Sequence, residues 1–421
     1  MGSWVFLLRS LIAARWRCDQ GAFQIEASAL KAALAVVRPA VEAKGANPLA
    51  AYVQVVVGDD RVAVTANRGD VAMRSAFKAD PGDTCEVVAP HDRLSQIVSL
   101  YDGQTLTMAY KASTRALTIR AAKASHVLTC ADPADWAPLD WTAKGRGADA
   151  PSPIILAAAG WSHLWGVAGY ASADVNRYGL AGVHLERVGD GETLRAAATD
   201  GSRLCWRGAR AEATIPIIGA DLPRKALISR EMAGVLGKAA GSAGAEDLFA
   251  LTVGERVAVW SQVDAEGDEV GSLRVRFSLV EGEFPDYRLV IPGSIKRTCT
   301  VKVGALATAL RSVAVSATDK QSSVRCSFEE GRMLLSAQDV GGKGGEARAE
   351  VECDFDGSPL QTGFNATYLE AVLRAAAGDS VTVHLGEALD PSIWLGELWR
   401  PQAGPLADVI DFVVVMPMRL D

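Results

Sequence analysis

The sequence predicts an α+β protein made of six helix-plus-sheet units that pair into three similar domains. Helical stretches rich in alanine and leucine recur, starting at residues 27, 90, 153, 224, 301 and 364. Hairpins with alternating apolar residues follow these stretches. One amphipathic helix on one small sheet buries little apolar area, so the units should pair. A length of 421 residues also fits about three domains.

The expected elements follow from these patterns. Helices are predicted over residues 27–44, 90–101, 153–169, 224–239, 301–313 and 364–377. Hairpin strands are predicted over 53–57 and 62–65, 106–110 and 117–120, 183–187 and 194–198, 249–253 and 257–260, and 324–328 and 333–337. A sixth hairpin begins at 381–385 and leads into a long loop. Helices on one face of antiparallel sheets give a layered α+β architecture.

Domain boundaries are expected where polar, glycine and proline residues gather, at residues 140–151 and 292–297. The predicted domains are therefore residues 22–145, 150–292 and 297–421. The first 21 residues lack the long unbroken apolar core and cleavage site of a signal peptide, so they are interpreted as an N-terminal extension.

The last eleven residues, Asp411–Asp421, have an unusual ending. The apolar run 412–415 predicts a buried strand, which should end near Met416 because Pro417 has no amide hydrogen to donate. Three apolar side chains, at positions 416, 418 and 420, then remain on a short tail. Two interpretations are open: an edge strand whose end is tucked into the core, or a docking surface, since methionine is frequent on surfaces that bind several partners.

Composition and charge narrow the class of protein. With 49% hydrophobic and 22% charged residues the chain has an ordinary soluble composition, and no apolar run is long enough to span a membrane. Seven dispersed cysteines without a CxxC pair indicate reduced thiols, so a cytoplasmic location is expected. The net charge of −7 argues against a nucleic-acid partner unless the charge is unevenly distributed.

The charge is unevenly distributed. The six helical stretches carry eleven basic and four acidic residues, which is +7 and leaves −14 for the rest of the chain. If the helices share a face, that face attracts phosphates without reading bases. The alternative is that lysine and arginine are present only because they are good helix formers.

No catalytic site is indicated. The run Gly341–Gly345 lacks the GxxxxGK[ST] spacing of a phosphate-binding loop, and the five histidines lie apart from one another. No nucleophile, base and oxyanion donor come together in the sequence. We therefore predict no catalytic residues, no metal ligands and no cofactor, and an enzyme with an unrecognised site is kept only as a less favoured alternative.

Four motifs carry a family resemblance: Ala198–Leu204 (ATDGSRL), Glu283–Arg288 (EFPDYR), Gly363–Leu369 (GFNATYL) and Val415–Leu420 (VMPMRL). Together, in this order, they resemble the bacterial DNA polymerase III sliding clamp, the β subunit. The resemblance covers about residues 22–420. It implies a DNA clamp fold, a head-to-tail homodimeric ring around duplex DNA, and a non-catalytic processivity factor that tethers the polymerase, the clamp loader and other replication and repair proteins.

The resemblance also implies two sets of site residues. The client-peptide groove would be formed by Leu180, Thr199, Gly201, Arg203, Leu204, Pro285, Val290, Val414, Val415, Met416, Pro417, Met418 and Arg419. Lys44, Arg177 and Tyr178 match positions that contact DNA. With basic residues of the helical stretches, the expected DNA-facing set is Lys31, Arg38, Lys44, Arg177, Tyr178, Arg224, Lys225, Lys238, Lys302, Arg311 and Arg374.

The sequence departs from the family at several points. Ser202 stands where histidine is common, Gly179 replaces a bulky residue beside the groove, and Leu289 replaces a basic residue. The loops 264–272 and 386–407 look long, and residues 1–21 and Asp421 are additional. An alternative within the same fold is therefore an accessory or mobile-element paralogue with altered partners.

Overall fold

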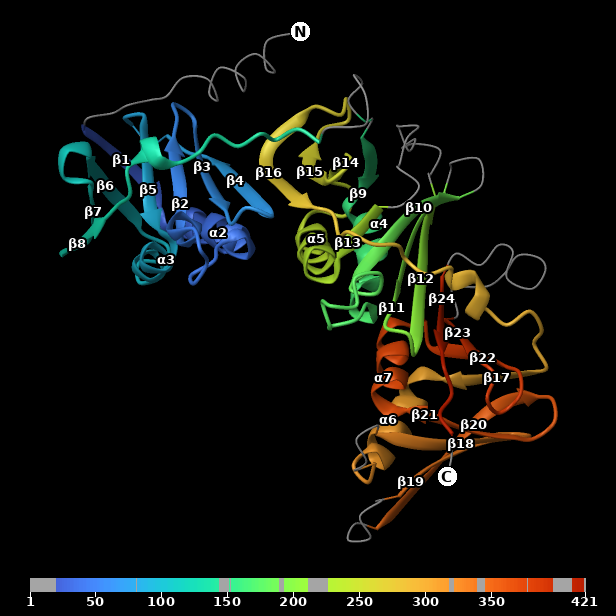
Figure 1. Ribbon diagram of the computed structural model, residues 1–421. Coiled ribbons are helices and arrows are strands. Elements are labelled where there is room, and N and C mark those ends of the chain that lie inside the picture. The colour runs from blue at the N-terminus through green and yellow to red at the C-terminus, as the bar shows by residue number, and fades with distance from the viewer. Residues whose placement is uncertain are drawn as a thin grey trace. The chain divides into compact units, whose positions relative to one another are not determined.

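The computed structural model describes residues 20–80, 82–143, 151, 153–188, 193–210, 226–317, 322–338, 345–376, 378–396 and 411–419 (Figure 1). The predicted N-terminal extension lies outside these residues except for Gln20 and Gly21, which open the first strand. Arg224, Lys225 and Asp421 also lie outside the described residues.

Each of the six predicted helical stretches overlaps one α-helix, and α5 and α6 extend three residues and one residue beyond the predicted ends at 239 and 313. The helices are α2 Ala27–Val37, α3 His91–Ser99, α4 Ala158–Trp165, α5 Arg230–Ser242, α6 Val303–Ala314 and α7 Ala366–Ala375. Short 3-10 helices follow two of them, η1 Arg38–Ala40 and η5 Gly166–Tyr170. Helix α2 ends before Pro39, and this proline opens the tighter turn.

Four predicted helix starts, at residues 153, 224, 301 and 364, were two or more residues too early, because each of these stretches begins with the end of a strand. Strands β9 Ile154–Ala157, β13 Ala226–Ser229 and β17 Arg297–Lys302 and the strand that ends at Asn365 lead directly into α4, α5, α6 and α7. Their residues form short apolar or mixed runs, which periodicity cannot distinguish from a buried helix. Pairing with neighbouring strands decides the outcome.

By their contacts the described residues form two compact units, and the three-domain division stays a prediction. The first unit holds the described residues of 20–161 and Lys238–Leu279. It contains a four-stranded antiparallel sheet in the order β1-β6-β7-β8. Its strands are β1 Gln20–Glu26, β6 Thr105–Lys111, β7 Ala116–Ala121 and β8 Ala124–Thr129.

The first unit also contains an eight-stranded sheet in the order β5-β2-β3-β4-β16-β15-β14-β9. The strands not yet placed are β2 Tyr52–Val57, β3 Arg61–Asn67, β4 Val71–Lys78, β5 Cys85–Pro90, β14 Leu248–Val253, β15 Val257–Val263 and β16 Glu269–Ser278. Helix α2 packs on β3 and β4, and α3 lies beside α2 (Figure 1). Leu30, Leu34 and Val37 of α2 are buried in this packing.

The second unit, residues 162–210, 226–237 and 280–419, is organised around a twelve-stranded sheet. Its order is β13-β10-β11-β12-β24-β23-β22-β17-β20-β19-β18-β21. The strands not yet placed are β10 Gly182–Val188, β11 Thr193–Thr199, β12 Arg203–Arg210, β18 Ser323–Glu329, β19 Arg332–Gln338, β20 Glu346–Asp356, β21 Leu360–Asn365, β22 Ser380–Leu385, β23 Ser392–Gly396 and β24 Phe412–Val415. Helices α6 and α7 lie side by side on this sheet (Figure 1).

The closing strand β24 ends at Val415, as predicted from Pro417. The interpretation as an edge strand was wrong, because β24 pairs with β12 on one side and β23 on the other. All four of its side chains are buried. The predicted long loops were also too long, since β16 begins at Glu269 and β23 lies within 386–407.

Among the described residues, no helix is long and apolar enough to cross a membrane. The same residues contain no cluster of three or more His, Cys, Asp or Glu that could hold a metal ion. Five of the six described cysteines are buried. Burial raises the pKa of the Cys205 thiol to about 12, so this thiol stays protonated.

Candidate peptide groove and basic surfaces

The turn between β11 and β12 forms one side of the candidate groove. Thr199 Oγ1 accepts a 3.0 Å bond from the Gly201 amide and donates a 2.7 Å bond to the Arg203 carbonyl. Asp200 Oδ1 accepts the amides of Ser202 and Arg203. Gly201 has φ +93°, which side chains with a Cβ rarely adopt. The Thr-Asp-Gly sequence therefore specifies this turn through its own hydrogen bonds.

Hydrogen bonds and two tyrosine rings fix the position of the Arg203 guanidinium. Its Nε donates to Asp200 at 2.9 Å and its Nη2 donates to the Gly169 carbonyl at 3.1 Å. Its planar group lies 4.9 Å from the ring centre of Tyr170 and 4.6 Å from that of Tyr368. Its side chain is only 13% exposed, so these contacts hold the guanidinium group beside the turn.

The tail after β24 is bound through its backbone to Ser202 and to strand β21. The Met416 amide donates a 2.9 Å bond to the Ser202 carbonyl, and the Met418 amide donates a 2.8 Å bond to Gly363 on β21. Met416, Pro417 and Met418 are half-buried and Arg419 is exposed. By contrast, the side chains of Leu204, Val414 and Val415 are buried in the sheet. The tail thus offers apolar side chains to solvent on a backbone anchored at two points.

Two loops carry the remaining groove residues. Leu180 is half-buried, and a Cβ on Gly201 would lie 3.9 Å from it. Pro285 and Val290 are exposed on the segment Glu283–Ile291, which includes the 3-10 helix η6 Tyr287–Val290. Leu289 beside them is 83% exposed. All thirteen predicted groove residues lie in the second compact unit.

A polar cluster that joins the segment Glu283–Ile291 to β10 was not predicted from the sequence. The Tyr287 hydroxyl donates to the Glu186 carboxylate, and Arg288 Nη2 donates to both of its oxygens, at 3.1 and 3.2 Å. Burial opposes ionisation, but hydrogen bonds from His184 and Tyr287 and the charge of Arg288 lower the pKa of Glu186 to about 2. Burial, followed by the neighbouring carboxylate, raises the pKa of Tyr287 to about 12.

The predicted DNA-facing residues lie in both units. In the first, Lys31 binds Asp102 at 2.6 Å, Arg38 lies 3.9 Å from Asp92, and Lys44 and Lys238 are exposed. In the second, Lys302 ends β17 and is exposed. Arg177 and Tyr178 are exposed in the loop after η5, and Arg177 donates a 2.7 Å bond to the Asp200 carbonyl. Arg177 therefore also supports the groove turn.

Arg311 of α6 and Arg374 of α7 are brought together. They line a shallow hollow of about 380 Å³ with Ala307, Glu370 and Leu373. Arg374 pairs with Glu370 at 3.2 Å, an exposed pair that contributes little to stability. This hollow places two guanidinium groups on the surface of adjacent helices.

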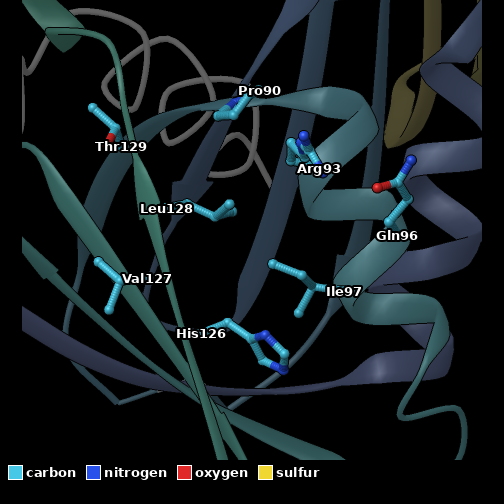
Figure 2. A pocket seen from close by; sticks show the side chains of 8 residues that line it. All are labelled: Pro90, Arg93, Gln96, Ile97, His126, Val127, Leu128 and Thr129. Atoms are coloured by element: carbon cyan, nitrogen blue, oxygen red, sulfur yellow. The ribbon is translucent and has the colours of Figure 1, made fainter.

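A second hollow, of about 480 Å³, lies between α3 and β8 (Figure 2). Arg93, Gln96 and Ile97 reach it from α3, and residues 126–129 line it from β8. His126 Nε2 is 2.7 Å from the Tyr101 hydroxyl. The residues that line this hollow belong to the first unit, whereas the predicted groove residues belong to the second.

Helices packed on antiparallel sheets, exposed arginines on α6 and α7 and a half-buried apolar tail after β24 are the features expected of a DNA clamp. The family model described as DNA polymerase III beta subunit, C-terminal domain, matches residues 288–395. The beta sliding clamp of Caulobacter vibrioides is 28% identical over 375 residues, covering 88% of this chain and 94% of that protein. The beta sliding clamp of Synechocystis sp. is 27% identical over 411 residues, covering 93% and 98%.

Solved structures of sliding clamps have the same fold as this chain. A Caulobacter crescentus beta sliding clamp superposes with a TM-score of 0.82 at 25% identity, covering 95% of this chain and 99% of that one. A sliding clamp from Bartonella birtlesii bound to griselimycin gives 0.81 at 22% identity, covering 95% and 100%. Over most of its length the chain is similar in sequence and in fold to the bacterial DNA polymerase III β subunits, the β sliding clamps, which are non-catalytic processivity factors. The enzyme alternative is thereby set aside.

Proposed function

We propose that two copies of this chain close head to tail into a ring around duplex DNA, and that each copy tethers client proteins through the groove described above. The proposal of a ring is supported by a type of antiparallel pairing, between the last strands of two separate strand series, that occurs twice within the chain. Strand β4 pairs with β16, with Arg74 opposite Arg274, and β12 pairs with β24, with Arg203 opposite Val415.

A third pairing of this kind requires a second copy. The described strands include six three-stranded series that follow one another along the chain: β2–β4, β6–β8, β10–β12, β14–β16, β18–β20 and β22–β24. Each of the two observed pairs joins the last strands of two series that are three apart, the first with the fourth and the third with the sixth. The second and fifth series remain, and their last strands are β8 and β20. Strand β8 ends its sheet, and β20 is paired over residues 346–352 with β19 alone among the described strands. Unpaired edges of this kind are templates for pairing between chains, so β8 of one copy would pair with β20 of the other.

The basic helical surface supports DNA inside such a ring. Arg311, Arg374 and Lys302 are exposed on or beside α6 and α7, while the chain as a whole is acidic. Guanidinium and ammonium groups attract phosphates by counterion release and carry no base information. Because the ring would hold the duplex topologically, weak contacts suffice and sliding is preserved.

The groove supports client tethering. Burying a large apolar side chain contributes about 1.5–3 kcal/mol, whereas micromolar affinity needs about 8 kcal/mol. Several apolar anchors must therefore bind together, and the half-buried Met416, Pro417, Met418 and Leu180 provide apolar surface for them. The proposed clients are the DNA polymerase III catalytic subunit and the clamp loader, acting in the cytoplasm.

A loading experiment tests the ring. The chain is loaded with its cognate clamp loader onto nicked circular DNA, washed at 0.5 M salt, and the DNA is then cut once. A topological ring stays on the circle at high salt, because counterion competition does not open it, and slides off the cut DNA. Release by salt from the circle would contradict the ring and indicate binding by surface charge alone.

A primer-extension assay distinguishes the replicative clamp from the paralogue. Processive synthesis on primed circular DNA by the cognate polymerase is expected to lengthen products several-fold when the clamp is present. A loaded ring that gives no stimulation would favour an accessory or mobile-element clamp with other clients.

A further inference from the structure

The segment Glu283–Ile291 supplies two exposed groove residues, Pro285 and Val290, yet it has only one turn of 3-10 helix. Its position is set by the side chains of Phe284 and Tyr287, which pack against strands β10 and β12. The Phe284 ring stacks on His184 at 5.1 Å, and Tyr287 packs edge-on against Trp206 at 5.5 Å. Because the segment has little secondary structure of its own, the positions of Pro285 and Val290 depend on these contacts with the sheet.

Glu186 on β10 is the polar anchor. It accepts the Tyr287 hydroxyl and two bonds from Arg288, and its side chain is 14% exposed. Arg195 Nη1 lies 3.6 Å from the same carboxylate, and its guanidinium lies 3.4 Å from the ring centre of Trp206. One carboxylate therefore connects the segment to two strands of the sheet.

Gly179 is the steric anchor at the other end of the segment. A Cβ built at Gly179 would lie 2.4 Å from the Glu283 carbonyl oxygen, a backbone atom that cannot rotate away. The Cβ of Tyr178 would lie 3.5 Å from a Cβ built at Gly282. The segment can approach the 177–180 loop this closely only because position 179 has no side chain.

We propose that Gly179 and Glu186 are positioning residues that fix the segment Glu283–Ile291 and thereby set the width of the groove and its affinity for a client peptide. This inference rests on the proposed client-binding function. The two residues act from opposite ends: Gly179 sets how closely Glu283 approaches Leu180, and Glu186 sets where Pro285 and Val290 lie. Neither residue needs to contact the peptide.

Peptide affinity in matched variants tests this. The probe is a fluorescein-labelled peptide that spans the clamp-binding segment of the cognate polymerase catalytic subunit, titrated with full-length clamp by fluorescence anisotropy. We expect Glu186→Gln and Gly179→Ala each to weaken binding about 5- to 20-fold, because the peptide must then order the segment itself. The milder Tyr287→Phe, which removes one hydroxyl donor, is expected to fall between these variants and the unaltered chain.

Hydrogen exchange distinguishes local loosening of the segment from a general loss of stability, because a general loss would speed exchange throughout the protein. Amides 283–291 should exchange faster in Glu186→Gln and Gly179→Ala, whereas exchange in α6 and α7 should be unchanged. Control variants are Glu329→Gln, which removes an exposed carboxylate paired with Arg332, and Gly234→Ala, where an added Cβ meets nothing within 4 Å. Both controls should bind the peptide like the unaltered chain.

The outcomes separate the two proposals. If the unaltered chain binds the peptide and Glu186→Gln, Gly179→Ala and Tyr287→Phe bind it equally well, the positioning role is wrong while the groove stands. If the unaltered chain does not bind the peptide at all, the client-binding function fails and this inference fails with it. If Glu186→Gln does not fold, Gly179→Ala and Tyr287→Phe decide the question.

Discussion

The Met418 amide donates a 2.8 Å hydrogen bond to the carbonyl of Gly363, which ties the end of the chain to β21. The Met416 amide is bound in the same way to Ser202. Backbone bonds therefore hold the tail, and the two methionine side chains are not needed for its placement. Their apolar surface can be removed without releasing the strand.

The first prediction follows because the backbone bonds that hold the tail do not depend on the two methionine side chains. The double variant Met416→Ala with Met418→Ala should bind the labelled client peptide at least about 30-fold more weakly, because two apolar contacts of about 1 kcal/mol or more each are lost. The backbone bonds at Ser202 and Gly363 remain, so the ring should assemble normally. Anisotropy measures the affinity and light scattering measures the mass. Unchanged peptide affinity would place the client site elsewhere.

The second prediction concerns the hollow between α6 and α7. Arg311→Ala with Arg374→Ala should weaken binding to a random duplex and lower the slope of log K against log salt by about 2 per chain, since each phosphate contact contributes about 0.9. The matched control is Arg325→Ala with Arg332→Ala, two exposed arginines on β18 and β19. Equal slopes in the two double variants would show that the helices do not face DNA.

Much of this fold could be predicted from local pattern. The sixfold spacing and alternating hairpins located six helices, and Pro417 located the end of β24. Strand β9 was missed because Ile154-Ile155-Leu156 has the same apolar character as a helix start, and only its pairing with β14 shows it to be a strand. The central place of β24 was missed for the same reason, because the partners of a strand are not encoded locally.

The site shows the same limit. The motif around Thr199–Arg203 was visible because its hydrogen bonds are formed within five residues. Arg203 was expected to orient peptides, but the two tyrosines that enclose it lie 33 and 165 residues away in sequence. Glu186 was missed although alternation in β10 places it on the same face as His184, because its partners Tyr287 and Arg288 are about 100 residues distant.

The third prediction uses the lowered pKa of Glu186. Its folded pKa of about 2 lies below the ordinary value, so the ionised carboxylate stabilises the fold above about pH 4.5. This contribution is lost as pH falls from about 4.5 towards 2. The stability difference between the unaltered chain and Glu186→Gln should therefore shrink by on the order of 1–2 kcal/mol between pH 7 and pH 3. Urea unfolding at both pH values measures it, with Glu329→Gln as control, and a pH-independent difference would contradict it.

The last prediction tests ring closure at β8. Val127 on this edge strand is 66% exposed, and in the proposed ring β20 of a second copy would lie against it. Val127→Glu would bury a carboxylate at that contact without a partner, which costs several kcal/mol, so we expect monomers at micromolar concentration where the unaltered chain is dimeric. Leu389→Glu is the control, because Leu389 is also exposed, at 56%, but lies on neither strand. Sedimentation velocity distinguishes the two masses, and a dimer that survives Val127→Glu while peptide binding is intact would move the closing edge away from β8.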